Sequence, residues 1–275
     1  MNRLFAWRYF HSPYSTQAIH LIAWVAITAI AVGTAALIII LSVFNGFEGL
    51  VKGLYGDFYA SVKVVPAQGK TLVWSKAAET QWRQDPAVLA IAGVVEEKAL
   101  LSASAPVMVN LLGIDSNYQR ISPIRKYLRR GSFQLGSDSE PAVVMGSGVE
   151  SALGLYNGPP FAPRLTVYLP NRAVALTEAD GLQSANLEPA GVFVWQTEFD
   201  NGYAFTDRGF LQAMLDYGPR EFTSIDVKTT MGKEDAVKQR LIAEWGSRAK
   251  VLTRYEQNST LYAVMQNEKW IIYLL

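Results

Sequence analysis

Side chains that could carry covalent or metal chemistry are scarce in this chain of 275 residues. It has no cysteine, which excludes thiol catalysis, zinc–thiolate sites and a disulfide framework. The only histidines are His11 and His20, so a Ser-His-Asp triad or a histidine metal site cannot form from residue 21 onward. We therefore expect no catalytic residue and no metal site.

Two glycine motifs resemble reactive or phosphate-binding loops. Gly146-Ser147-Gly148 precedes an expected helix, but no histidine is available to activate the serine, so we interpret it as a turn and helix cap. Gly69-Lys70-Thr71 resembles the end of a phosphate-binding loop, yet Val64 stands where the first glycine should be. Neither motif indicates an enzyme.

Charge adds little to the list of candidate sites. The chain has 25 basic and 24 acidic residues, a balance that argues against nucleic acid as a partner. The acidic pairs Glu96-Glu97 and Asp138/Glu140 lie in polar stretches, and we expect them to be solvated. The chain is predicted to be non-catalytic.

The elements that position everything else begin with a membrane anchor. Residues 21–44 carry no charge, and a helix of that length spans about 36 Å, against about 30 Å of bilayer hydrocarbon. A buried helix of a soluble protein is rarely uncharged all round, and the apolar part of a signal peptide is shorter. We predict an uncleaved transmembrane helix.

Flanking charge predicts the orientation of this helix. Arg3 and Arg8 precede it, and no acidic residue occurs before Glu48. By the positive-inside rule, residues 1–20 form a cytoplasmic segment, amphipathic or alternatively disordered, and the chain beyond residue 44 is exported.

Two stripes on the predicted helix suggest helix–helix contacts. Small residues that permit close approach in lipid recur at Ala26, Ala29, Gly33 and Ala36. Large apolar residues recur at steps of three and four at Phe44, Phe47, Val51, Leu54 and Phe58. The second stripe predicts that the helix continues beyond the membrane as a stalk.

The last residues resemble the start of another membrane helix. Glu268 and Lys269 are followed by Trp270 and five apolar residues, too few to cross a bilayer. We expect residues 266–275 to begin a second transmembrane helix, so that the sequence is a piece of a longer membrane protein. A C-terminal strand or tail packed on the domain is the alternative.

The exported segment, residues 45–265, has an α+β pattern. Alternation predicts several strands, including a hairpin over Val94–Ile114. Ser75 is expected to cap a helix, and helices are also expected at Thr206–Met214 and Lys233–Trp245. A long polar loop is expected at Asn171–Asn186.

Several segments resemble the lipoprotein-releasing ABC permeases of the LolC/LolE family. They are, in chain order, Ala6-Trp7-Arg8-Tyr9, Ala31–Leu37, Leu41–Glu48, Leu112–Asp115, Arg130–Phe133 and Asn267-Glu268-Lys269. The likeness spans the chain and is densest in its first sixty residues. It implies the N-terminal portion of a permease with four membrane helices, of which the third and fourth are absent from this sequence.

The resemblance also implies the architecture and the partners. The exported domain would be MacB-like, with one subdomain from residues 48–115 and 226–265 and a β-rich subdomain from residues 116–225. ATP and Mg²⁺ would bind a separate cytoplasmic ABC ATPase dimer, with no cofactor in this chain. A second permease copy or a sister permease, membrane lipid, an acylated lipoprotein and a periplasmic lipoprotein chaperone complete the implied partners at the inner membrane.

The implied mechanism is mechanotransmission, in which closure of the ATPase dimer moves the stalks and exported domains. Phe44, Phe47, Val51 and Leu54 lie where an acyl-chain groove is expected, with helix core as the alternative role. The implied chaperone loop is the apolar stretch Ala173, Val174, Ala175 and Leu176.

Two alternative functions stay open at this point. A MacB/FtsX-like permease could act on another cargo or as a signalling transmitter. A membrane-tethered periplasmic domain could also serve for binding or scaffolding.

Overall fold

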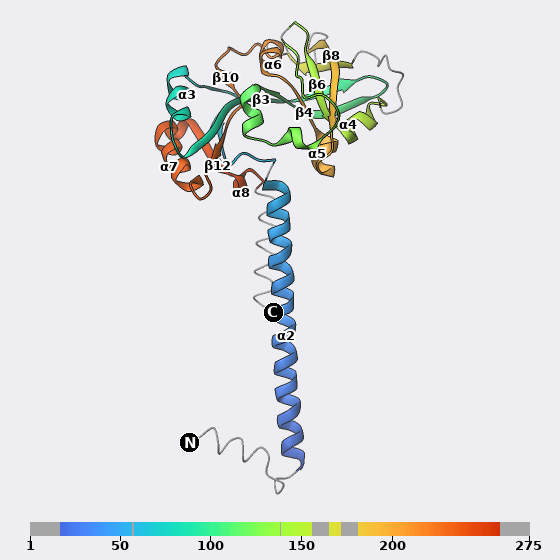
Figure 1. Ribbon diagram of the computed structural model, residues 1–275, viewed down its shortest axis with the longest axis vertical. Coiled ribbons are helices and arrows are strands. Elements are labelled where there is room, and N and C mark those ends of the chain that lie inside the picture. Colours follow the sequence, from blue (N-terminus) through green and yellow to red (C-terminus); the bar gives the residue numbers. More distant parts are fainter. Residues whose placement is uncertain (1–16, 57, 138, 156–164, 172–180, 259–275) are drawn as a thin grey trace. The chain divides into compact units, whose positions relative to one another are not determined.

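The computed structural model describes residues 17–56, 58–137, 139–155, 165–171 and 181–258 (Figure 1). Contacts divide the chain into two compact units, one of Met1–Leu54 with Ala263–Leu275 and one of Tyr55–Tyr262. Each unit is described by itself below.

The first unit contains all but the last two residues of the long helix α2, Gln17–Gly56, which is about 60 Å long (Figure 1). Its segment His20–Phe47 is long and apolar enough to cross a membrane and includes the predicted span. The Thr34 hydroxyl donates to the carbonyl of Ile30 at 2.8 Å, which satisfies this polar group within the helix. Among the described residues this is the one candidate span.

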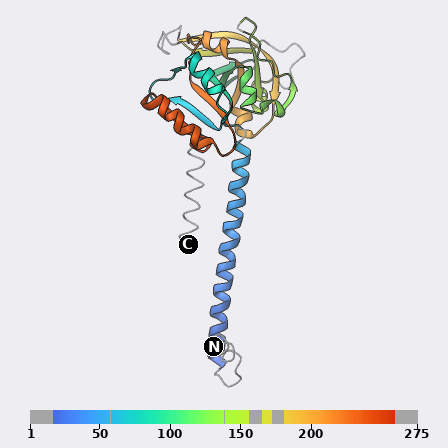
Figure 2. The same cartoon turned by 60° about the vertical axis from the view of Figure 1, so that its left-hand side comes forward.

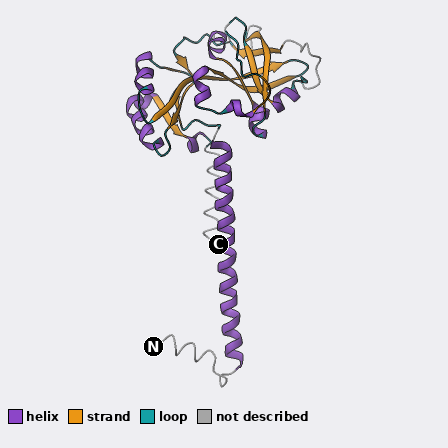
Figure 3. Ribbon diagram, in the orientation of Figure 1, coloured by secondary structure: helices purple, strands orange, loops and turns teal. Residues whose placement is uncertain are grey.

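The second unit is built on a mixed sheet of ten strands (Figure 3). Along one path the order is β12-β1-β11-β3-β4-β9-β6-β8-β5, and β7 pairs with both β3 and β8. The strands are β1 Val62–Pro66, β3 Val88–Ser102, β4 Pro106–Ile114, β5 Leu128–Gly131, β6 Ala142–Gly146, β7 Leu165–Pro170, β8 Leu182–Phe193, β9 Tyr203–Asp207, β11 Ser224–Thr229 and β12 Ala249–Thr253. β2 Leu72–Val73 and β10 Glu221–Phe222 form a separate two-stranded sheet.

Strand pairing divides the sheet into two parts joined by β3. Its first half pairs with β11, and its second half pairs with β4 and β7. The pairings β3-β4-β9-β6-β8-β7 return to β3 and so close a ring of strands, with β4-β9 and β6-β8 parallel. Along β7 buried and part-exposed residues alternate, as expected for a strand with one face in a core.

Two hydrophobic cores lie on the two faces of this sheet. The first is covered by α3, α4, α6 and α7, and α7 packs on β1 and β12 (Figures 1 and 2). The second contains residues of α5 and of two 3₁₀ turns. These elements are α3 Lys76–Arg83, η1 Ser116–Arg120, η2 Ile124–Tyr127, α4 Ser147–Ala152, α5 Thr197–Gly202, α6 Arg208–Met214, α7 Glu234–Trp245 and α8 Arg254–Gln257.

The predicted α+β class is confirmed, as are several local predictions. The Ser75 hydroxyl accepts from the amide of Ala78 at the start of α3, and β3 and β4 form the expected hairpin. Two predictions need correction. The helix expected from Thr206 begins at Arg208, because Thr206 belongs to β9, and the loop expected to reach Asn186 ends where β8 begins at Leu182.

Candidate functional site

The sequence-predicted lipid and packing residues all lie on α2. Ala26, Ala29, Gly33 and Ala36 are exposed in the isolated chain, and no atom lies within 4 Å of a Cβ built on Gly33. Phe44 is half-buried and Phe47 is 51% exposed. The side chains of Val51 and Leu54 lie outside the described part of the structure. The helix-packing role of the small residues and the lipid-groove role of the large ones both stay predictions.

α2 continues beyond the candidate span His20–Phe47, as the stalk prediction expected, but Phe58 does not belong to the stripe. α2 ends at Gly56, and Phe58 is buried in the second core of the domain. Its ring stacks on Phe199 with centroids 3.6 Å apart and meets Trp195 and Tyr203 edge-on. The helix therefore ends two residues before the apolar repeat that predicted it.

The predicted chaperone loop, Ala173–Leu176, lies outside the described residues. The strands that flank it are paired from Leu165↔Leu187 to Pro170↔Leu182, and the amide of Asn171 donates to Gly181 at 2.9 Å. The segment 172–180 therefore connects two strands whose ends are held together.

The glycine motif is a helix start, as predicted. Gly146 is the N-cap of α4, and a Cβ there would lie 2.2 Å from the carbonyl oxygen of Asp200. The glycines thus permit α4 and α5 to pack closely, a structural role.

The acidic pair Glu96-Glu97 is not solvated as expected. Glu97 pairs with Lys70 at 2.9 Å, and Glu96 pairs with Lys63 at 3.3 Å. Both carboxylates lie on β3, where strand alternation turns them to opposite faces of the sheet. Glu96 belongs to a cluster that the sequence analysis missed.

This cluster lies where the chain enters and leaves the second unit, a region we call the junction (residues 58–66 and 249–257). β1 and β12 pair over five residues, from Val62↔Thr253 to Pro66↔Ala249. The pairing is extended by the backbone amide of Arg254, which donates to the carbonyl of Ser61 at 3.2 Å. The side-chain amide of Gln257 also donates to the carbonyl of Ala60 at 2.9 Å.

Register brings three charged groups together at the junction, and we call Lys63, Glu96 and Asp226 the junction cluster. Lys63 on β1 is the cross-strand partner of Asp226 on β11. Their neighbours along each strand are buried in the first core, so both charged side chains face the other side of the sheet. Asp226 is 3% exposed and accepts from the Ser224 hydroxyl at 3.0 Å.

Glu96 lies where β3 passes from the open part of the sheet into the ring of strands. Its amide donates to the Thr223 hydroxyl at 2.7 Å, and the Thr223 amide donates to Val94. This local irregularity separates β10 from β11. The Lys63–Glu96 ion pair thus links the strand that follows α2 to the point where the two parts of the sheet meet.

Burial and charge shift the pKa values in the junction cluster. Burial raises the pKa of the Asp226 carboxyl, the charge of Glu96 raises it further, and Lys63 opposes the shift. Burial alone would lower the pKa of the Lys63 ammonium, but Asp226 and Glu96 outweigh it and raise that pKa. Both shifts follow from two carboxylates sharing one ammonium in a poorly solvated place.

A cavity of about 260 Å³ opens beside the cluster. Lys63, Glu96 and Asp226 line it together with three tyrosines, Tyr59, Tyr118 and Tyr203. Burial raises the pKa of all three phenols, that of Tyr203 to about 12, so each stays a neutral hydroxyl at physiological pH. The site can bind a polar group but offers no activated nucleophile.

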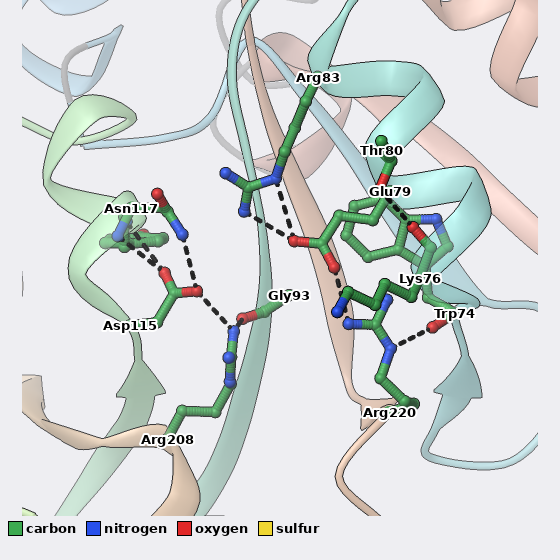
Figure 4. A network of polar contacts seen from close by, with 11 residues as sticks. Trp74, Lys76, Glu79, Thr80, Arg83, Gly93, Asp115, Asn117, Arg208 and Arg220 are labelled. Carbon is green, nitrogen blue, oxygen red and sulfur yellow. Dashed lines mark hydrogen bonds and ion pairs between the residues drawn. The ribbon is translucent and has the colours of Figure 1, made fainter.

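A second group of charged side chains, the Glu79 network, is centred on helix α3 (Figure 4). Glu79 of α3 pairs with Arg83 and with Arg220, each at 2.7 Å, and Arg220 also donates to the carbonyl of Trp74 at 2.8 Å. The two guanidinium groups overcome burial and lower the pKa of Glu79. This arrangement fastens α3 to the β10 region and has a structural role.

A neighbouring ion pair fastens α6 to η1. Arg208 pairs with Asp115 at 2.9 Å and donates to the carbonyl of Gly93 at 3.1 Å (Figure 4). A Cβ on Gly93 would lie 2.4 Å from the Phe222 ring, so glycine is needed for this close approach.

The sequence carried one signal for the junction cluster. Asp226 is a lone acidic residue in a strand of alternating pattern, and Lys63 stands between valines in another. A charge at such a position indicates a partner across the sheet, but only the register identifies it.

The fold defines a class: a mixed α/β domain in a chain that also contains an apolar helix long enough to span a membrane. The chain belongs to the family of the MacB-like periplasmic core domain, whose family model matches residues 23–243. This match confirms the MacB-like permease superfamily predicted from the sequence and identifies the second unit as the extracytoplasmic domain of a membrane protein.

The solved structures that match this chain have low sequence identity to it. The periplasmic region of MacB from Actinobacillus actinomycetemcomitans is 13% identical, with a TM-score of 0.49, over 73% of this chain and 91% of that one. The extracellular domain of the noncanonic ABC-type transporter YknZ from Gram-positive bacteria is 10% identical, with a TM-score of 0.48, over 70% and 99%. No curated protein sequence matches this chain. The family assignment rests on the family model.

Proposed function

We propose that the chain is part of the permease subunit of an ABC transporter that extracts lipoproteins from the inner membrane for a periplasmic chaperone. Residues 1–20 would face the cytoplasm and the second unit the periplasm. Membership of the MacB-like family and the apolar span of α2 support the transporter class. The likeness of Leu41–Glu48 and the other quoted segments to lipoprotein-releasing permeases supports the cargo.

The observation that carries the mechanism is the pairing of β1 with β12. Five consecutive residue pairs join the segment that follows α2 to the last strand of the second unit. In the proposed mechanism, a movement of α2 would reach the second unit through β1, which is hydrogen-bonded into the sheet. The Lys63–Glu96 ion pair extends this path to β3, which runs into the ring of strands.

ATP hydrolysis belongs to a separate cytoplasmic ATPase dimer in this proposal, with Mg²⁺ bound there. This chain contributes no catalytic group and transmits the conformational change. A second copy or a sister permease would pack on the stripe of Ala26, Ala29, Gly33 and Ala36, where small side chains permit close helix approach.

The acyl chains of the lipoprotein would enter a lateral groove lined by Phe44, Phe47, Val51 and Leu54, in contact with membrane lipid. Burial of each methylene contributes about 0.8 kcal/mol, so an apolar surface alone gives substantial affinity. The Ala173–Leu176 segment, between two paired strands, would contact the chaperone.

The test is a photo-crosslinker at Phe47 in the full-length membrane protein, with the same group at Ile39 as control. Ile39 is also exposed on α2 but lies deeper in the apolar span. We expect Phe47 to capture a triacylated lipoprotein that is released when the ATPase and ATP are added, and Ile39 to capture phospholipid only.

Other outcomes separate the alternatives. An ATPase that binds while Phe47 captures no acylated protein would exclude the lipoprotein cargo and favour a MacB/FtsX-like permease with another cargo or a signalling role. Failure of any ATPase to co-purify would favour a tethered binding or scaffold domain.

A further inference from the structure

The cavity beside the junction cluster contains polar groups that no residue of the described chain satisfies. Only one carboxylate oxygen of Asp226 has a hydrogen bond, to the Ser224 hydroxyl, and no cation of the described residues lies within ion-pair distance of the other. Tyr118, 3% exposed, lines the same cavity, and its hydroxyl has no hydrogen-bond partner among the described residues. Neither atom is sealed from the cavity, so a donor group held in the cavity could reach both of them.

The charges in the cavity do not balance. Glu96 and Asp226 bring two carboxylates, and Lys63 supplies one ammonium, whose ion pair is with Glu96. A second cation beside Asp226 would supply the missing counter-charge, and since Asp226 is already buried, the desolvation cost would fall mainly on the incoming cation.

The side chains that line the cavity also suit a cation. Phe58 and Tyr203 contribute ring surface, which attracts cations, and Tyr59 adds a further hydroxyl. A cavity of about 260 Å³ is below the usual range for drug-sized ligands, so the occupant must be small.

We propose that this cavity binds a primary ammonium group. Its N–H donors suit the free oxygen of Asp226 and the Tyr118 hydroxyl, which both face this cavity. The group could belong to a free small amine or to the headgroup of an aminophospholipid. This inference does not depend on the transported cargo.

The first experiment is calorimetric titration of the full chain in detergent with ethanolamine. Ethylene glycol is the matched probe, since it differs only in a hydroxyl in place of the ammonium. We expect saturable binding of ethanolamine and none of ethylene glycol. Choline, which has no N–H donor, should bind about tenfold more weakly.

Variants then locate the site. Asp226→Asn and Tyr118→Phe should each weaken ethanolamine binding about tenfold, with a cooperative melting transition no lower than that of the unaltered chain as the check on folding. Glu188→Gln, on exposed β8, and Tyr168→Phe, on β7, are the matched controls and should bind as the unaltered chain does. Tyr118→Phe keeps the test decisive if Asp226→Asn does not fold.

The source of the ammonium is distinguished in nanodiscs. If phosphatidylethanolamine, but not phosphatidylglycerol, abolishes ethanolamine binding, the ligand is a lipid headgroup. If neither competes, it is a free amine. Absence of saturable ethanolamine binding, or binding that survives both variants, would overturn the proposal and leave a water-filled cavity.

Discussion

The junction cluster and the Glu79 network both bring several charged side chains together, but with opposite balance. In the junction cluster two carboxylates share the ammonium of Lys63, whereas in the Glu79 network one carboxylate is held by Arg83 and Arg220. The pKa of Asp226 is accordingly raised and that of Glu79 lowered. One site is destabilised by its negative charge and the other is stabilised by it.

This contrast fits the places of the two groups in the fold. The Glu79 network fastens α3 to the β10 region, where rigidity serves stability alone. The junction cluster lies where the chain enters and leaves the domain and where β3 passes into the ring. Because local stability varies across a protein, we infer that unbalanced charge makes the junction the part that responds most readily to a ligand or to force.

The largest effect is expected from Lys63→Met, which leaves Glu96 and Asp226 without a counter-charge. Asp226 is buried but the Lys63–Glu96 ion pair is partly exposed, so the loss should be about 2 kcal/mol in unfolding free energy, below that of a fully buried pair. Urea unfolding followed by tryptophan fluorescence measures it. Lys250→Met, exposed on β12, is the control and should change little.

A double variant sharpens this prediction. Adding Asp226→Leu to Lys63→Met removes one of the two stranded carboxylates and should restore about half of the lost stability. If the double variant is less stable than Lys63→Met, side-chain packing rather than charge balance governs the junction.

Much of the fold could be predicted from the sequence, but little of the contrast between the two charged groups could. Alternation and turns predicted the β3–β4 hairpin, the cap at Ser75 and the helix ending at Trp245, because these are local features. The strand β9 was missed, since it is short and pairs in parallel with β4, nearly a hundred residues earlier.

The sequence did not predict the junction cluster, for the same reason. Lys63 and Asp226 are brought together by register between strands that lie far apart in the chain. Their strand patterns showed that each is flanked by apolar residues, but not that they share a face. For Phe58 the error was the reverse, a predicted relation that the structure lacks. Its spacing assigned it to the helical stripe, but the helix ends at Gly56 and Phe58 is buried in the domain.

Arg220→Met tests the other side of the comparison and should cost about 1.5 kcal/mol. It removes the hydrogen bonds to Trp74 and Glu79, and its side chain is 35% exposed, which limits the effect. Because the pKa of Glu79 is lowered, this stabilisation is present above the unfolded pKa of about 4.3 and lost as the pH falls through the folded value. The unfolding free energies of the variant and of the unaltered chain should therefore approach each other as the pH falls from 7 to 3.

Asp226→Asn should do the reverse and stabilise the domain, by about 1 kcal/mol at pH 7. A raised carboxyl pKa contributes stability below the unfolded value of about 3.9, and this is lost as the pH rises through the folded value. The gain of the variant should therefore shrink as the pH falls toward 4. Destabilisation at pH 7 would show that Asp226 is held as a needed partner of Lys63.

The smallest effect is expected from Arg83→Ala, about 0.3 kcal/mol. Arg83 and Glu79 lie one helical turn apart on α3, and Glu79 keeps Arg220 when Arg83 is lost. Alanine also favours the helix, which offsets part of the cost. Melting temperatures in low and in molar salt provide the measurement, because screening should abolish so exposed a contribution. An effect as large as that of Arg220→Met would mean that the network acts as one unit, and that its balance, like that of the junction cluster, depends on every charge.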